Sequence, residues 1–141
     1  MTDGPQFWMI PNAPTPVAPF SHASESGGWV FLTGQMPTSP DDDAAPLPEG
    51  VVAQTRRVMD NITAILKAES LTCDNVAKTT IFLADLGDFQ TVNEIYGSYF
   101  KQAPPARSTV QVAALPKGAR VEIEVIAVAG DADQTAADTS G

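Results

Sequence analysis

The last third of the chain contains two segments rich in β-branched residues, with a short turn between them. Residues 108–114 and 121–128 have the composition of strands, and Pro116-Lys117-Gly118 has the composition of a turn. The simplest interpretation is a hairpin. Because Arg107 follows Pro104-Pro105 at the start of the first strand, this pairing would bring it within reach of a glutamate on the second strand.

The second of these segments presents two different faces, because side chains alternate along a strand. One face is entirely apolar and consists of Val121, Ile123, Val125 and Ala127. The other face combines Glu122 and Glu124 with Ile126 and Val128. Two carboxylates among so many apolar residues are unusual in a strand. They fit either a solvated hairpin with exposed charges or a charged site.

The preceding segments alternate between strands and amphipathic helices. We predict strands over residues 7–10, 29–33 and 76–83, and helices over residues 51–69 and 89–101. Asp85 and Asp88 are candidate N-caps of the second helix, because aspartate is favoured at that position. The chain therefore reads as a single α+β domain with a mixed sheet.

Two helices can cover only one face of such a sheet. The strands nevertheless carry apolar residues on both faces: Trp29 and Phe31 alternate with Val30 and Leu32. We therefore expect both helices on one face of the sheet. The other face should be buried against copies of the same chain, which predicts a homo-oligomer.

Length and charge exclude several classes of protein. The 141 residues suit one domain, assigned to residues 1–129, and residues 130–141 lack any apolar periodicity, so we predict a disordered tail. A net charge of −9 argues against a nucleic-acid partner. The sequence shows no run of about 18 apolar residues for a membrane span. With one cysteine, Cys73, and no secretory signal, a cytoplasmic location is expected.

Candidates for a metal site are weak. His22 is the only histidine and has no ligand at metal-site spacing. The aspartates at 41–43 lack the spacing of a calcium loop. The sequence shows no catalytic triad, Cys–His pair or phosphate-binding glycine loop. We therefore expect neither metal nor cofactor, and the residues alone leave an Arg–Glu site at a strand end as the alternative to a solvated hairpin with exposed charges.

Four segments carry a resemblance to a known family. FLTGQ, QTRRVMDNITAIL, KTTIFLADLGDFQTVNEIYGSYF and PPARSTVQVAALPKGARVEIEVIAVA resemble, in this order, the RidA/YjgF family of imine and enamine deaminases, over roughly residues 5–129. The resemblance implies a chorismate-mutase-like α+β fold and a homotrimer. In such a trimer the helices face outward, the sheets pack centrally, and clefts between subunits hold the sites.

The chemistry that the resemblance implies is cofactor-independent hydrolysis of reactive imino or enamino acids, such as 2-aminoacrylate, to a 2-keto acid and ammonia. Arg107 matches the family's carboxylate-binding arginine, and a guanidinium suits that role because it meets a carboxylate with two parallel hydrogen bonds. Glu122, the first glutamate of VEIE, matches the acid that orients the attacking water. Asn93, Thr33 and Gly34 match pocket residues.

Two positions depart from the family pattern. Phe20, in APFSHA, stands where the best-known members have a tyrosine, so a phenol hydroxyl is absent. Thr109 stands where those members often have a cysteine two residues after the arginine. Both are expected to contact substrate. The departures bear on the identity of the substrate more than on the class of reaction.

Three interpretations of function remain open. The first is a deaminase with housekeeping imine substrates. The second is a related enzyme of one catabolic pathway that acts on an aminoacrylate or aminomuconate derivative. The third is a non-catalytic, regulatory trimer that binds a small ligand, which the departures at Phe20 and Thr109 favour and the retained Arg107 and Glu122 oppose. The ribonuclease activity attributed to some relatives fits poorly with the acidic charge.

Overall fold

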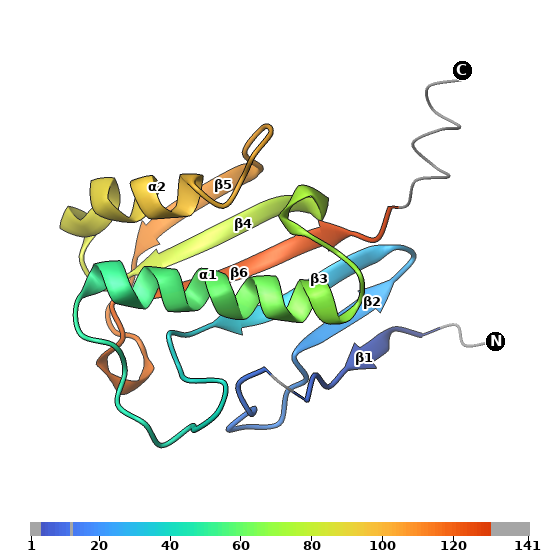
Figure 1. Ribbon diagram of the computed structural model, residues 1–141, viewed down its shortest axis with the longest axis horizontal. Helices are drawn as coiled ribbons and strands as arrows, with labels where there is room; N and C mark the ends of the chain where they lie inside the picture. Colours follow the sequence, from blue (N-terminus) through green and yellow to red (C-terminus); the bar gives the residue numbers. More distant parts are fainter. Residues whose placement is uncertain (1–3, 12, 131–141) are drawn as a thin grey trace.

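A six-stranded mixed sheet organises the part of the chain that this computed structural model describes, residues 4–11 and 13–130 (Figure 1). The strand order is β1-β2-β3-β6-β4-β5. All neighbours are antiparallel except β4 and β5, which are parallel. The strands are β1 (Gln6–Trp8), β2 (Ala23–Ser26), β3 (Trp29–Gln35), β4 (Val76–Leu83), β5 (Ala106–Gln111) and β6 (Val121–Val128). Of the predicted tail, residues 131–141 lie outside the described part.

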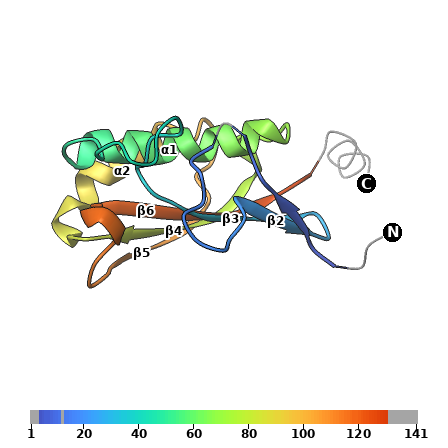
Figure 2. The ribbon, with the colours of Figure 1, turned by 90° about the horizontal axis from the view of Figure 1, so that it is seen from below.

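Two α-helices, α1 (Val51–Ala68) and α2 (Phe89–Gly97), lie on the same face of the sheet, as the sequence predicted (Figure 2). The side of α1 that faces the sheet buries residues at helical spacing, because they form an apolar stripe. Its larger apolar members are Val58, Met59, Ile62, Ile65 and Leu66. They pack on the alternate residues of β6 that the sequence assigned to one face, all of them buried. This layer between helices and sheet is the hydrophobic core.

The predicted hairpin is wrong. β6 does not pair with β5; it lies between β3 and β4, and β5 pairs in parallel with β4 at the edge of the sheet. The reason is the helix between β4 and β5: a β–α–β crossover makes the two strands parallel neighbours and packs α2 on the sheet. The turn at Pro116–Gly118 then carries the chain past β4 to the centre.

Several element boundaries also differ from expectation. β2, with the sequence ASES, was not predicted, because its side chains are small and polar; it forms a hairpin with β3 through Gly27 and Gly28, whose φ angles of 58° and 84° suit a two-residue turn. Helix α2 ends at Gly97, earlier than predicted. Asp85 caps the short 3₁₀ turn before α2, accepting from the Gly87 N–H at 2.8 Å.

Asp88, the other candidate cap, occupies the N-cap position of α2 but makes no side-chain cap bond. Its carboxylate instead accepts a 2.6 Å hydrogen bond from Arg120, the residue that precedes β6. This ion pair ties the start of α2 to the start of β6. Since Arg120 is 43% exposed, we assign the pair a positioning role more than a large contribution to stability.

The face of the sheet opposite the helices carries exposed apolar side chains within one chain. Trp29, Phe31 and Val110 are 50%, 45% and 42% exposed. Phe31 pairs with Ile126 and Val110 with Phe82, so these residues share that face, because directly paired residues point the same way. Exposed apolar side chains on one face are typical of a surface that contacts a partner. No helix of the described residues is long and apolar enough to cross a membrane.

Candidate functional site

Glu122 lies at the beginning of β6, on the face opposite the helices. It pairs with Phe82 of β4 and is half-buried, while its neighbours Val121 and Ile123 point into the core. On the other side of β6 the register with β3 shifts between Leu32 and Gln35. This irregularity allows β3 to bend away beside Glu122.

Gly34 lies within that irregular stretch and is required by the position of Glu122. A Cβ built on Gly34 would overlap the Oε2 atom of Glu122 and would lie 3.1 Å from its Cδ and 3.3 Å from its Cγ. The carboxylate is thus packed directly against the Gly34 backbone. A glycine at a strand end indicates a close approach, and here the approaching group is a side chain.

The environment of Glu122 disfavours its charge. Burial raises the pKa of this carboxyl above its ordinary value, and the negative charge of Glu124, two residues further on the same face, raises it further. A carboxylate with a raised pKa is a stronger proton acceptor once ionised. The position therefore suits a group that holds and polarises a water molecule.

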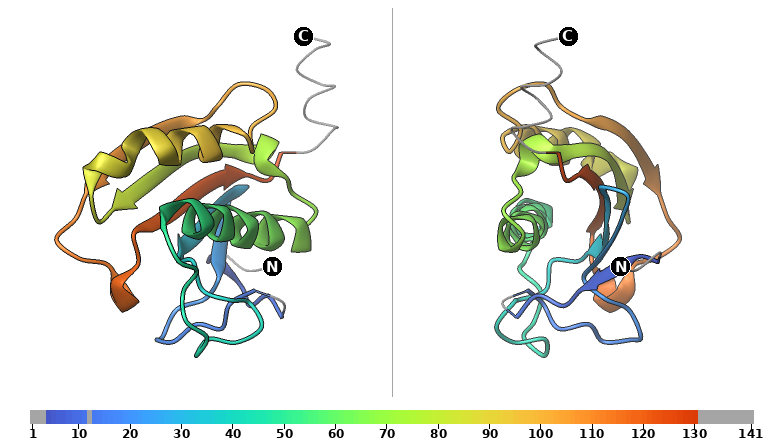
Figure 3. Two further views of the ribbon diagram at one scale, coloured as in Figure 1. Left: turned by 60° about the vertical axis from the view of Figure 1, so that its left-hand side comes forward. Right: turned by 90° about the vertical axis from the view of Figure 1, so that its right-hand side faces the viewer.

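A cavity of about 390 Å³ opens beside this carboxylate. We refer to it as the Glu122 chamber. Residues 14–18, Phe20 and the loop after β3 contribute to its walls, together with Pro116 and Lys117. The segment before β2 and the loop after β3 lie next to each other beside the sheet (Figure 3). The chamber brings together the predicted site residues Phe20, Thr33, Gly34 and Glu122.

Buried hydrogen bonds hold these walls in place. His22 accepts a 2.7 Å bond at Nδ1 from the Ile10 N–H, so its Nε2 carries the hydrogen and donates to the Pro14 carbonyl at 2.5 Å. The Thr33 hydroxyl donates to the Ser21 carbonyl at 2.6 Å. His22 thus anchors the wall. The described residues include no group of three or more His, Cys, Asp or Glu side chains that could hold a metal ion.

Arg107 lies on β5, on the face covered by the helices. It pairs with Thr79 of β4, and its guanidinium carbon is 5.4 Å from the ring centroid of Phe89 and 5.2 Å from that of Tyr96, both on α2. The Tyr96 hydroxyl is 2.7 Å from the Thr79 Oγ1. Aromatic faces attract a guanidinium and restrict where it points. This arrangement orients Arg107 before any ligand binds.

Two further predicted site residues accompany Arg107, and we call the three the Arg107 cluster. Asn93 follows Phe89 by one helical turn and is half-buried on α2. Thr109 lies two residues after Arg107 on the same face of β5. Its Oγ1 is buried, and among the described residues it has no hydrogen-bond partner. A hydroxyl in that condition is available to a ligand.

The structure does not bring Arg107 and Glu122 together within one chain, which corrects the expectation drawn from the hairpin. The Arg107 side chain lies on the face of the sheet that the helices cover, whereas the Glu122 side chain lies on the opposite face. The two strands are also separated by β4. The candidate site therefore consists of two parts, and one chain presents each of them at a different place.

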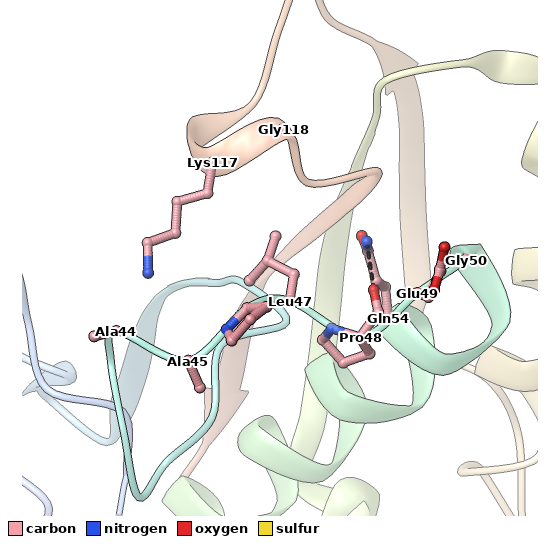
Figure 4. Close-up of a pocket in the computed structure, with 10 residues that line it drawn as sticks. Ala44, Ala45, Leu47, Pro48, Glu49, Gly50, Gln54, Lys117 and Gly118 are labelled. Atoms are coloured by element: carbon pink, nitrogen blue, oxygen red, sulfur yellow. Dashed lines mark hydrogen bonds between the residues drawn. The ribbon is translucent and has the colours of Figure 1, made fainter.

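A second cavity, of about 570 Å³, lies between residues 44–50 and the turn at Pro116–Gly118 (Figure 4). Lys117 extends across it toward Ala44 and Ala45. The Gln54 amide in its wall is already occupied, donating to the Pro48 carbonyl and accepting from the Arg120 N–H. Although this cavity is larger, the smaller chamber contains the carboxyl with the raised pKa and is therefore the stronger candidate for a functional site.

Sheet topology, the one-sided helical layer and the two-part arrangement of acid and arginine define an α+β protein with a candidate ligand site. Comparison with known proteins gives the family. A family model described as endoribonuclease L-PSP matches residues 10–129. The chain belongs to this family, which is also the RidA/YjgF family whose motifs it resembles.

Individual relatives agree with this assignment. Over 119 residues the chain is 51% identical to protein DfrA of Myxococcus xanthus, covering 82% of this chain and 89% of that one. It is 46% identical over 118 residues to the mouse 2-iminobutanoate/2-iminopropanoate deaminase, covering 84% and 87% of the two chains. The Rid-family protein YyfA of Yersinia pestis has a similar structure, with a TM-score of 0.84, 43% identity and coverage of 89% and 99%.

Sequence reasoning missed two features of the site. Phe89 and Tyr96 belong to a stripe at helical spacing that reads as core; Tyr96 is indeed buried, but both rings also contact Arg107. Val17 and Met36 line the chamber from segments without regular structure. The helical spacing of Phe89 and Tyr96 could have shown that the two rings lie on one side of the helix. The irregular segments that contain Val17 and Met36 have no pattern from which their place in the chamber could be predicted.

We predict that Gly34→Ala lowers activity while the fold is retained. The added methyl group forces the Glu122 carboxylate to move, because it would overlap Oε2. If Glu122 is the group that polarises the attacking water, its displacement costs about a hundredfold in rate. Gly34 does not have a positive φ, so alanine itself is tolerated by the backbone. Steady-state kinetics and thermal melting on the variant test this, with Gly97→Ala, where an added Cβ meets open space, as control. Wild-type turnover by Gly34→Ala would contradict it.

Proposed function

We propose that the protein hydrolyses reactive 2-imino acids, and the enamino acids that tautomerise to them, to 2-keto acids and ammonia. Water adds to the C=N carbon, the carbon–nitrogen bond of the resulting adduct breaks, and the water oxygen remains as the keto oxygen. The nitrogen leaves as ammonia with the protons of that water. The observation that carries the proposal is the half-buried Glu122 carboxyl, with its raised pKa, at the wall of a substrate-sized chamber.

In this proposal Glu122 and Arg107 have separate roles. Glu122 accepts a proton from the attacking water and returns it to the departing nitrogen. Arg107, held by two aromatic rings, binds the substrate carboxylate through its planar fork. Thr109, whose buried hydroxyl lacks a partner among the described residues, and Asn93 complete the carboxylate side. The mouse relative that carries a deaminase name supports this chemistry.

The proposed site forms between subunits. Because one chain presents Arg107 and Glu122 on opposite faces of its sheet, a neighbouring chain has to supply the missing part. The exposed apolar face with Trp29 and Phe31 gives the chains a reason to associate, since its burial removes apolar surface from water. A closed ring of three chains, as the family resemblance implies, satisfies both requirements.

We predict a homotrimer at micromolar concentration. Its mass is about 44 kDa, three times the 14.8 kDa of one chain, and light scattering coupled to size exclusion measures it. Phe31→Asp should dissociate the trimer, because it places a charge in the middle of the buried face. Val52→Asp, on the exposed side of α1, is the matched control and should remain trimeric. A monomeric wild-type protein would contradict both the trimer and the shared site.

The function itself is tested by product formation. Imino acids are generated in the assay from amino acids by an amino-acid oxidase, and the release of ammonia and keto acid is followed with and without the protein. We expect hydrolysis faster than the spontaneous rate. Absence of any acceleration over a panel of imino acids would contradict the proposal. The same preparation incubated with single-stranded RNA is expected to show no cleavage, because a net charge of −9 opposes binding of phosphates.

A further inference from the structure

We propose that the Glu122 chamber selects imino acids with long, uncharged, apolar side chains over the three- and four-carbon substrates named for the deaminase relatives. This inference rests on the proposed function, because it assigns a substrate class to the same site. It is motivated by the chemistry of the chamber walls and by the volume of the chamber.

The walls around the Glu122 carboxylate are mostly apolar. Their apolar members include Pro16, Val17, Ala18, Phe20, Met36 and Pro116. Phe20 offers a ring without a hydroxyl, so it adds no hydrogen bond for a polar substrate group. Apolar walls with a few well-placed polar groups are typical of sites that bind organic ligands. Polar side chains contribute to the lining as well, among them Thr15, Thr33, Thr38, Asp43 and Lys117.

The chamber is larger than a short imino acid requires. Its volume of about 390 Å³ falls within the range of roughly 300–1,000 Å³ that holds drug-sized ligands. A single methyl or ethyl side chain would leave most of this space to water. Specific hydrogen bonds also hold the wall in place, because the two ring nitrogens of His22 bind the Ile10 N–H and the Pro14 carbonyl.

The geometry of the substrate directs its side chain into this space. An imino carbon carries three substituents: the nitrogen, the carboxylate and the side chain. In the proposed site the carboxylate binds Arg107 of a neighbouring subunit and Glu122 holds the attacking water. The side chain then extends along the chamber, past Phe20 toward Val17.

The charges of the chamber oppose a second carboxylate on the substrate. Glu122 and Asp43 contribute two negative charges and Lys117 one positive charge. Lys117 is also occupied, since its Nζ donates to the Asp43 carbonyl oxygen. The lining therefore carries a net negative charge when all three groups are ionised. An uncharged side chain suits it better than a dicarboxylate such as an aminomuconate derivative.

The test measures kcat/KM for a series of imino acids generated from alanine, 2-aminobutyrate, norvaline, norleucine, methionine and glutamate. One methylene in an apolar pocket changes kcat/KM by about tenfold or more. We expect kcat/KM to rise along the series to norleucine and methionine, by at least tenfold over alanine, and to be low for glutamate. Equal or falling values along the series, with measurable turnover, would overturn this inference and leave the proposed function intact. No turnover of any member would overturn the proposed function, and this inference with it.

Two substitutions at Val17 test the wall directly. Val17 is 77% exposed, so neither change disturbs the core. Val17→Trp fills the chamber, and Val17→Asp charges its wall. Both should lower the ratio of kcat/KM for norleucine imine to that for alanine imine at least tenfold. The matched controls, Val52→Trp and Val52→Asp on α1, should retain the wild-type ratio. An unchanged ratio in both Val17 variants would overturn the assignment.

Discussion

Replacing Glu122 with glutamine is expected to lower kcat by about a hundredfold or more, the usual contribution of a positioned general base, with little change in KM. The amide keeps the size of the side chain and one acceptor oxygen, but it cannot take a proton from water. Arg107, which binds the substrate carboxylate in this proposal, is unaffected. A loss confined to kcat identifies an interaction made in the transition state.

The same variant is expected to be more stable than the wild type at neutral pH. Burial and Glu124 raise the pKa of Glu122 in the folded state, so folding favours its protonated form. That contribution to stability is fully present below the pKa of the unfolded chain and is lost as pH rises through the folded pKa. Glutamine has no charge to desolvate. The difference in melting temperature should therefore be small in acid and grow toward neutral pH.

The wild-type enzyme should show the corresponding pH profile. In the proposed mechanism activity requires the ionised form of Glu122, so kcat/KM should rise with pH through a pKa above that of an ordinary glutamate. Glu124→Gln is the matched control. It removes a neighbouring charge and therefore shifts the acidic limb of the profile to lower pH, while the limb itself persists because Glu122 is retained. Wild-type kcat in Glu122→Gln, or a melting temperature that drops at neutral pH, would remove Glu122 from the proposed role.

The sequence predicted layers and faces better than it predicted strand order. Alternation in residues 121–128 correctly placed Val121 and Ile123 in the core and Glu122 on the opposite face, because the period of a strand is a local property. The pairing of β5 with β4 was missed, because a tight turn between two apolar segments suggests a hairpin whether or not one forms. Whether β5 pairs with β6 or with β4 depends on where α2 packs on the sheet. This packing is a tertiary interaction, which a local sequence pattern does not encode.

The same distinction applies to the site. The family resemblance identified Arg107 and Glu122 as site residues. Neither the periodicity nor the motifs indicate that the two side chains lie on opposite faces of one sheet. That result follows from combining strand order with side-chain alternation. Gly34 is intermediate: the family resemblance matched it to a pocket residue, and the structure shows the Glu122 carboxylate packed against its backbone. The chamber walls could not be predicted, since residues 13–20 have no periodic pattern.

Arg107→Lys is expected to lower kcat/KM by about tenfold to more than a hundredfold, which corresponds to a charged hydrogen bond worth about 1.5–3 kcal/mol. Lysine keeps the charge but loses the fork that meets a carboxylate with two parallel bonds. It also stacks less well between Phe89 and Tyr96, whose rings hold the guanidinium in place. Arg120→Lys is the matched control, because that arginine pairs with Asp88 and lies outside the Arg107 cluster. Its activity should remain close to that of the wild type.

Mixed oligomers test the shared site most directly. Arg107→Gln and Glu122→Gln subunits are purified separately with different affinity tags, unfolded, mixed in equal amounts and refolded together. Each variant alone is nearly inactive, but a Glu122 chamber from one variant and an Arg107 cluster from the other form an intact site. In a ring of three, every trimer that contains both variants has such a pairing at one of its three sites. We therefore expect the doubly tagged fraction to recover about a third of the wild-type activity per chain, with the separately refolded variants as controls. If both residues acted within one chain, every chain in the mixture would still lack one of them. Activity would then stay at the mean of the two variants, and the site between subunits would be excluded.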